Sequence, residues 1–380
     1  MAFCQASEVY QRRTSTPSNE DEKILKAALA NYGRAVTLLR HKLASTDYVP
    51  SESATATSSA LATFDLIIAD GAEDKISHSA SFAHFEACKW FLEAQSKDAS
   101  SPPTTIARAF FQDYCRFELF RVCSLGKLNT VTESVCENTY WSGMEPFSIA
   151  YLPSNYASLQ RASHEIDLRL ARLTQYVRMM RDGDEISASR VTALADLMLE
   201  FENLPAENET LHQVRVVRTT NIAERHIVPV SFDFDSQHWP MLVHYWATLL
   251  TLVRLCLLTD FLARKEHNLS WLDHEKTARL VATQQRAVSN LLMSRQYAFE
   301  RSIVARLQVV HPLVIVWATL AGRSTTPQGI PVVEMKRWIL SQLQRSGVSF
   351  LRDWTEQDLD NATKIFDIPD RLKQQQRYPA

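Results

Sequence analysis

The segment from residue 239 to residue 258, WPMLVHYWATLLTLVRLCLL, is the feature that most constrains how this chain can fold. A helix that spans a lipid bilayer needs ~20 consecutive apolar residues with few or no charges. Here the uncharged run ends at Arg254, and Asp260 follows soon after. The segment therefore predicts a helix buried inside a large protein, with no membrane contact.

Glycine usage supports a helical fold. Only 8 of the 380 residues are glycine, whereas ~7% is usual. Rossmann sheets and P-loops use glycine in turns and at phosphate contacts. We therefore predict an all-α fold, a large irregular multi-helix domain with a buried central apolar helix at about residues 239–260.

Apolar residues recur at helical spacing along most of the chain, and the clearest series has intervals of 4, 3, 4, 3 and 4 residues: Leu25, Leu29, Tyr32, Val36, Leu39 and Leu43. Such spacing places all six side chains on one helix face. The pattern predicts one helical domain over residues 21–368. We expect a disordered leader at 1–20 and a frayed tail at 369–380. Thr355 with Asp358 predicts the start of a final short helix.

Four passages depart from this periodicity or interrupt it. Residues 46–59, rich in Ser, Thr and Ala, predict a loop or a weak helix start. Residues 128–158 predict an irregular connection. A later helix is expected to close at Pro205. Residues 214–234 have strand-like character, but the segment is short and contains Pro229, so we expect an extended connection in place of a sheet.

The sequence carries no motif typical of a catalytic or cofactor site. No two of the six cysteines are spaced as CxxC, which excludes the common zinc patterns. GxSxG, HExxH, GxGxxG and GxxxxGK[ST] are absent. Asn290 and Ser294 have the spacing of a terpene-cyclase metal motif, but Ala298 stands where that motif has Glu. We therefore predict no cofactor, no metal and no catalytic residue.

Charge gives little support for direct DNA binding. The formal net charge is −2, whereas a dedicated nucleic-acid-binding domain usually has a strong positive excess. The helix expected at 161–181 carries five Arg against Glu165 and Asp167, a pattern that more often belongs to a solvated face than to a phosphate contact. The N-terminal residues lack the apolar stretch of a secretory signal, so we expect the cytosol or the nucleus.

Aromatic side chains on the two most apolar helices supply enough surface to line a pocket for a small molecule. Such clusters more often form the core. The candidate effector-pocket residues are Trp239, His244, Tyr245, Trp246, Arg254 and Trp317.

Six segments follow one another in an order that is typical of one family: NYGRAVTLLRHKLAS at 31–45, ALATFDLIIADG at 60–71, FAHFEACKWFLEA at 82–94, HYWATLLTLVRLCLLTDF at 244–261, LMSRQYAFERSIVARLQVVHPLVIVWATLAG at 292–322 and EMKRWILSQLQRSG at 334–347. Pro312 and Leu313 match a Pro-Leu pair of that family. In these segments the chain resembles the fungal-specific transcription factor domain, which is the regulatory region of Zn2Cys6 zinc-cluster regulators.

The resemblance implies an all-α regulatory domain with a nuclear role in transcription, within a secondary-metabolism gene cluster. It implies a protein partner, either a DNA-binding regulator or a second copy of the chain, and a small-molecule effector. The family's cysteine-rich DNA-binding module is absent, so specific DNA binding is not implied. The alternatives are an all-α enzyme or small-molecule carrier that uses the aromatic interior, or a dimerisation scaffold. Cytoplasm is the alternative location.

Overall fold

The computed structural model describes most of the C-terminal half of the chain and three N-terminal helices. The described residues are 19–45, 51–68, 80–96, 188–202, 204–234, 238–267, 270–301, 303–348 and 351–363, with Ser158 and Ala162. Within them the chain forms ten α-helices and one sheet of two short strands. The prediction of an all-α fold is therefore confirmed.

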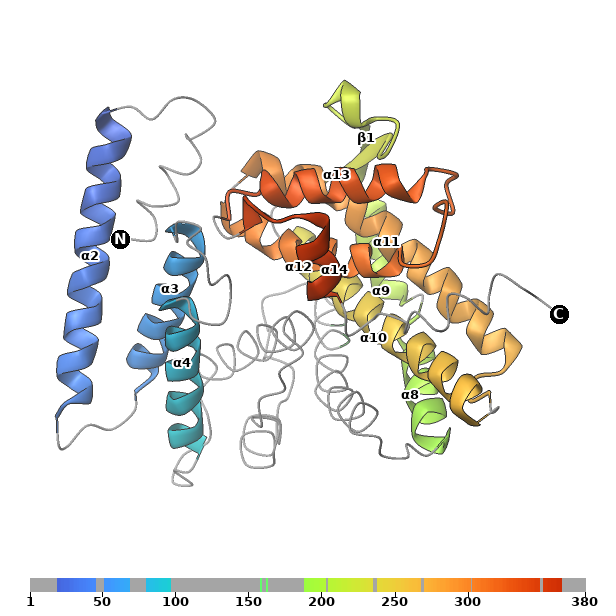
Figure 1. Ribbon diagram of the computed structural model, residues 1–380, viewed down its shortest axis with the longest axis horizontal. Coiled ribbons are helices and arrows are strands. Elements are labelled where there is room, and N and C mark those ends of the chain that lie inside the picture. Colours follow the sequence, from blue (N-terminus) through green and yellow to red (C-terminus); the bar gives the residue numbers. More distant parts are fainter. Residues whose placement is uncertain are drawn as a thin grey trace.

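The first three helices pack side by side at one side of the molecule (Figure 1). They are α2 (Asn19–Leu43), α3 (Glu52–Ile68) and α4 (Ala80–Ser96). α3 packs closely on α4, and α2 lies against α3. Two small apolar clusters between them contain the buried residues Ala28, Leu39, Ala54, Leu61, Phe64 and Phe91.

The polar stretch at 46–59 contains the start of α3, at Glu52. Small side chains explain why a helix forms here. Ala54, Thr55 and Ser58 are buried, which lets α4 approach closely, and the Cys88 thiol lies 3.6 Å from the carbonyl oxygen of Thr55.

The long apolar helix lies at the centre of the C-terminal core, as the sequence predicts. It is α10 (His238–His267), and it packs against α8 (Ala188–Glu200), α11 (His274–Arg301) and α12 (Ile303–Thr319). Trp239–Phe261 is long and apolar enough to cross a membrane, but 83% of its apolar window is buried inside the protein. That burial is expected of the core helix of a globular protein.

Polar side chains of α10 are satisfied within the helix, which allows several of its faces to be buried. The Thr251 hydroxyl donates to the Ala247 carbonyl at 2.8 Å, and that of Thr259 donates to Leu255 at 2.7 Å. Bonding one turn back removes the cost of burying a hydroxyl. Asp260 accepts the backbone N–H groups of Trp271 and Leu272 and so fixes the connection into α11.

The expectation of an extended connection at 214–234 is wrong. β1 (Arg215–Arg218) and β2 (Val230–Asp233) pair antiparallel, with Arg215 opposite Asp233. β2 packs against α11, and this tertiary contact stabilises a sheet that local propensity leaves uncertain. Pro229 lies immediately before β2, so its missing N–H removes no hydrogen bond of the β2 residues themselves.

Pro205 opens a helix where the sequence predicted only the end of one. α9 (Pro205–Gln213) begins at this residue. The first N–H groups of a helix have no partner within the helix, so the missing N–H of proline costs nothing at this position. The short 3-10 helix η2 (Ile222–Glu224) then lies between the two strands in the sequence.

The last two described helices cover the core next to α12. They are α13 (Val332–Gln344) and α14 (Glu356–Ala362). The predicted start of α14 is confirmed, since Thr355 and Asp358 form a capping box. Pro312 lies inside α12, which continues as one helix to Thr319.

Several expectations concern residues outside the described part of the chain. They are the connection at 128–158, apart from Ser158, the helix at 161–181, apart from Ala162, and the tail at 369–380. Of the leader at 1–20, only residues 19 and 20 are described, and they belong to α2.

The burial of Trp246 gives a direct test of the core. Its side chain is fully buried, stacks on Phe232 and donates from Nε1 to Glu207 at 2.7 Å. Trp246→Ala should lower the free energy of unfolding by about 3–5 kcal/mol, because it leaves a cavity and removes the indole donor to Glu207. Urea denaturation measures the change. The control Val333→Ala alters a side chain that is 63% exposed and should cost within about 0.5 kcal/mol; equal losses would contradict the assignment.

Candidate functional site

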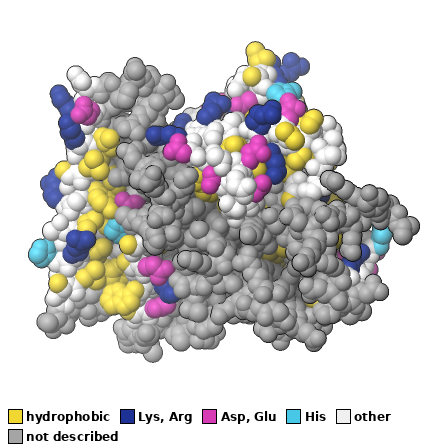
Figure 2. Space-filling view, in the orientation of Figure 1, with side chains coloured by type: hydrophobic (Ala, Val, Ile, Leu, Met, Phe, Trp, Pro, Cys, Tyr) yellow, Lys and Arg dark blue, Asp and Glu magenta, His cyan; other side chains and the backbone are white. Residues whose placement is uncertain are grey.

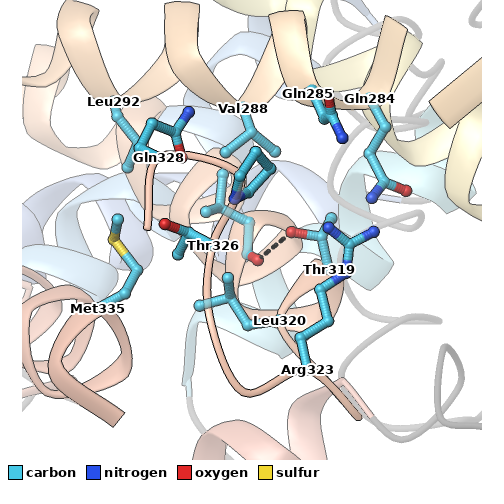
Figure 3. A pocket seen from close by; sticks show the side chains of 12 residues that line it. Gln284, Gln285, Val288, Leu292, Thr319, Leu320, Arg323, Thr326, Gln328 and Met335 are labelled. Atoms are coloured by element: carbon cyan, nitrogen blue, oxygen red, sulfur yellow. Dashed lines mark hydrogen bonds between the residues drawn. The ribbon is translucent and has the colours of Figure 1, made fainter. Parts of the chain in front are cut away.

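A pocket lies between α11, α12, the following loop and the start of α13 (Figure 3). Together with the part that opens to solvent, it holds about 370 Å³ of empty space. Its apolar lining consists of Val288, Leu292, Val316, Leu320, Pro327 and Met335. Its polar lining consists of Gln284, Gln285, Thr319, Thr326, Gln328 and Arg323.

Gln284 is the unusual residue of this lining. Its side chain is 2% exposed, and its Oε1 atom has no hydrogen-bond donor within the described structure. Leaving a buried acceptor unsatisfied costs about 1–3 kcal/mol. Ser58 and Trp338 also have a buried polar atom without a partner, but they do not line the pocket. At Gln284 a bound molecule could supply the missing donor.

Three other polar side chains of the lining, those of Gln328, Thr326 and Thr319, already have hydrogen-bond partners. Gln328 donates to Ser289 at 3.1 Å, and the Thr326 hydroxyl accepts the N–H of Ile330. The Thr319 hydroxyl donates to the carbonyl of Val316 (Figure 3). These bonds shape the wall and leave Gln284 as its buried acceptor.

Arg323 supplies the charge at the pocket. Figure 3 shows Gln284, Gln285, Thr319 and Arg323 at one end, and Leu292 and Met335 at the other. Gln328 lies beside Leu292, so polar and apolar side chains both occur along the wall. Arg323 is exposed, and among the described residues no ion pair occupies its guanidinium.

The loop that carries Arg323 is fixed by two glycines and a narrow turn. Gly322 and Gly329 have φ of 75° and 80°, which is the left-handed region that glycine adopts without strain. The N–H of Thr326 donates to the Ile330 carbonyl at 2.8 Å, and Thr325 pairs with Pro331 as a β-bridge. These contacts close the loop on itself, and the bond from Gln328 to Ser289 attaches it to α11.

The six predicted effector-pocket residues do not line this pocket. Trp239, Tyr245, Trp246 and Trp317 are buried in the main core; Arg254 is buried and His244 half-buried, both on α10. The three indole N–H groups donate in separate directions, to α11 at Ser294, to α9 at Glu207 and to Asp360 of α14. These tryptophans therefore join α10 and α12 to their neighbours.

Sequence reasoning missed the pocket because its key property is not local. Gln284 lies on a polar helix, and nothing in its neighbourhood signals that its side chain is buried. A weak signal exists in STTPQG at 324–329, where glycine and proline among polar residues predict a shaped loop.

A second polar centre joins η2, α11 and α13. Arg295 is 7% exposed and donates to Glu224 at 2.6 Å and to Gln342 at 2.5 Å. Its guanidinium also lies over the rings of Phe299 and Trp338, at 4.9 and 5.3 Å from their centroids. Burial lowers the pKa of Arg295, and the charge of Glu224 opposes that effect. The surrounding partners make this centre a structural clamp.

A third centre joins the N-terminal helices. The Tyr32 hydroxyl donates to Asp65 at 3.1 Å and lies 3.0 Å from Nε2 of His84. Burial raises the pKa of Asp65 to about 6. Burial and the charge of Arg40 lower the pKa of His84, and the pKa of Tyr32 is raised mainly by burial.

The described residues offer no group of three or more His, Cys, Asp or Glu side chains that could hold a metal ion. The thiols of Cys88 and Cys256 are buried, which raises the pKa of each to about 12. Such thiols stay protonated near neutral pH and are poor nucleophiles.

The Arg295 centre predicts a large effect of a small substitution. Glu224→Gln leaves a buried guanidinium without its counter-charge, and should lower the free energy of unfolding by about 3–5 kcal/mol. Guanidinium denaturation of the full chain measures this loss. Glu209→Gln is the matched control at an exposed position, with an expected change within about 0.5 kcal/mol. A loss at Glu224 no larger than that at Glu209 would exclude the clamp.

The raised pKa of Asp65 predicts a pH effect. Between the ordinary pKa of 3.8 and the folded value of about 6, the folded chain holds a proton that the unfolded chain has released. The contribution of Asp65 to stability therefore increases as the pH falls through about 6. Asp65→Asn stays neutral at every pH, so its advantage over the wild type should be larger at pH 7.5 than at pH 5. Urea denaturation at both values measures the difference. A constant advantage would show that Asp65 titrates normally.

Comparison of the chain with protein-family models, with curated proteins and with solved structures finds no match. The resemblance to the fungal-specific transcription factor domain therefore rests on the six quoted segments alone.

Proposed function

We propose that this chain is a transcription-regulator-like helical protein whose activity is set by a small-molecule effector bound between α11, α12 and α13. The observation that carries the proposal is the buried Oε1 of Gln284, a residue of the pocket lining, which has no donor among the described residues. The resemblance stated for the sequence supplies the regulatory setting, in which the chain acts on a protein partner in the nucleus.

The lining indicates the chemistry of the effector. An N–H or O–H group would pair with Oε1 of Gln284, and an acidic group would pair with Arg323, whose planar guanidinium suits a carboxylate. An apolar ring or chain would contact Val288, Leu292 and Met335. The effector class is therefore a small, largely apolar organic acid with one further hydrogen-bond donor.

The same lining favours binding over catalysis. Among the described residues of the lining, Arg323 alone has an ionisable side chain, and a guanidinium is not a general base. None of these described residues has a carboxylate, imidazole, thiol or amine. The alternative of an enzyme or carrier that uses the aromatic interior is less well supported, because the indole N–H groups of Trp239, Trp246 and Trp317 already have protein acceptors.

A matched set of probes tests the effector site. Indole-3-acetate has a ring N–H and a carboxylate; indole-3-ethanol lacks the carboxylate, and 1-methylindole-3-acetate lacks the N–H. At about 100 times its Kd, a ligand should stabilise the protein by about 2.7 kcal/mol. We expect indole-3-acetate to raise the Tm of the wild type most, and each analogue to bind about tenfold more weakly, which corresponds to ~1.4 kcal/mol.

Gln284→Leu separates binding from folding. Since Oε1 of Gln284 has no partner, its replacement by an apolar side chain should leave the free energy of unfolding unchanged or raise it. The same variant should weaken binding of indole-3-acetate about tenfold. Gln357→Leu on the exposed face of α14 is the control, with unchanged binding. Equal binding by all three ligands, or by Gln284→Leu and wild type, would reject the site.

The regulatory role is tested separately. The full chain, fused to an unrelated DNA-binding domain, should change expression of a reporter gene in fungal cells, and Gln284→Leu should alter the response to added effector. A fusion that is silent, with and without the ligand, would reject transcriptional control while leaving the binding result in place.

A further inference from the structure

The outer edge of β1 has hydrogen-bonding groups that β2 does not use. In the register, Val216 lies opposite Phe232 and Arg218 opposite Val230. The N–H of Thr219 donates to the Pro229 carbonyl at 3.2 Å, one residue pair beyond Arg218. Hydrogen-bonded pairs alternate along an antiparallel ladder. The backbone groups of Val216 and Arg218 therefore point away from β2.

This edge stands free of the helices within the described structure. β1 projects from the body (Figure 1), and no other described strand pairs with it. The side chain of Val216 is 54% exposed, and that of Ile222, in the following turn of η2, is 74% exposed. Figure 2 shows hydrophobic and basic side chains together on this projecting tip. Exposed apolar side chains beside a free strand edge favour strand addition.

The charged side chains of residues 214–227, the projecting tip, indicate which kind of partner segment would bind. Residues 214–227 contain Arg215, Arg218 and Arg225, and their single acid, Glu224, is buried against Arg295. Arg215 pairs with Asp233, while Arg218 is exposed and no described acid pairs with it. The Nε of Arg225 donates to the Thr219 carbonyl at 2.8 Å. This bond replaces the ladder bond that Pro229, which has no N–H, cannot donate to Thr219. Arg218 therefore places a positive charge beside the free backbone groups of the edge, whereas the charge of Arg215 is balanced by Asp233.

We propose that the outer edge of β1 docks an extended acidic segment of a partner protein, which adds as a third strand. Main-chain bonds to Val216 and Arg218 would hold the segment, and acidic side chains opposite Arg218 would select it. Pairing with a second copy is disfavoured, because β1 has two arginines and no acid, so that self-pairing adds charge of one sign.

Synthetic peptides and the full chain test the docking. The fluorescently labelled peptide TEVVET carries two acids around two valines and complements the RVVR sequence of β1. We expect it to bind in fluorescence anisotropy, with an affinity that falls as salt is added. TKVVKT reverses the charge, and TEVVET methylated at its backbone nitrogens keeps the side chains but loses the N–H groups. Each should bind at least about tenfold more weakly.

Two variants locate the peptide on the chain. Val216→Pro removes an N–H that points away from β2, so the β1–β2 ladder should remain, as circular dichroism and the Tm will check, while peptide binding falls about tenfold. Arg218→Glu should weaken TEVVET and favour TKVVKT. Leu38→Glu, on an exposed face of α2, is the control and should change neither.

Each remaining outcome overturns the proposal. Absence of binding by wild type would exclude docking of an acidic strand. Equal binding of the methylated peptide would show that the backbone of β1 is not involved, whatever the folding of the Val216 variant. A concentration-dependent dimer that Arg218→Glu abolishes would identify a second copy as the occupant.

Discussion

The rest of the structure depends on the burial of α10, whose indole N–H groups and Asp260 carboxylate are hydrogen-bonded to the elements around it. A helix that is apolar on most faces can only sit inside a protein if other elements surround it. Here the indole N–H groups of Trp239 and Trp246 direct α11 and α9 to their places, and Asp260 fixes the connection between α10 and α11. Hydrogen bonds from the most apolar segment thus specify which elements pack on it, while apolar burial supplies the free energy.

The unpartnered acceptor of Gln284 at the pocket wall contrasts with the core indoles that have hydrogen-bond acceptors. The indoles of the core show that this chain can satisfy buried polar groups across long sequence separations. Gln284 is as buried as those tryptophans, yet its Oε1 has no donor. Buried unsatisfied groups are few in native proteins and often belong to functional sites. Under the proposed function, a ligand that supplied the donor would convert the cost of leaving Gln284 unpaired into a gain in affinity.

The sequence predicts the elements that local patterns determine. The apolar run of α10 and the Thr355 capping box each depend on nearby residues, and both are confirmed. The β1–β2 sheet was missed because contact with α11 decides its formation, and such contacts are invisible in a single segment. The candidate effector pocket was placed on Trp246 and Trp317 by their size and apolar character. Those properties cannot distinguish a ligand site from a core in which these two indoles have protein acceptors.

The pocket and the edge of β1 are joined by one rigid element. Gln284 lies on α11, and Gln296, twelve residues further along the same helix, accepts the N–H of Thr220 at 3.1 Å. Twelve residues of helix span about 18 Å. Thr220 follows β1 closely, so a displacement of α11 by an effector would reach the strand edge through that bond and through the contact of α11 with β2. An effector can shift this equilibrium only by its difference in affinity for the two positions of α11. Gln284 could supply such a difference, because its hydrogen bond to the effector would depend on where α11 stands relative to the loop that carries Arg323.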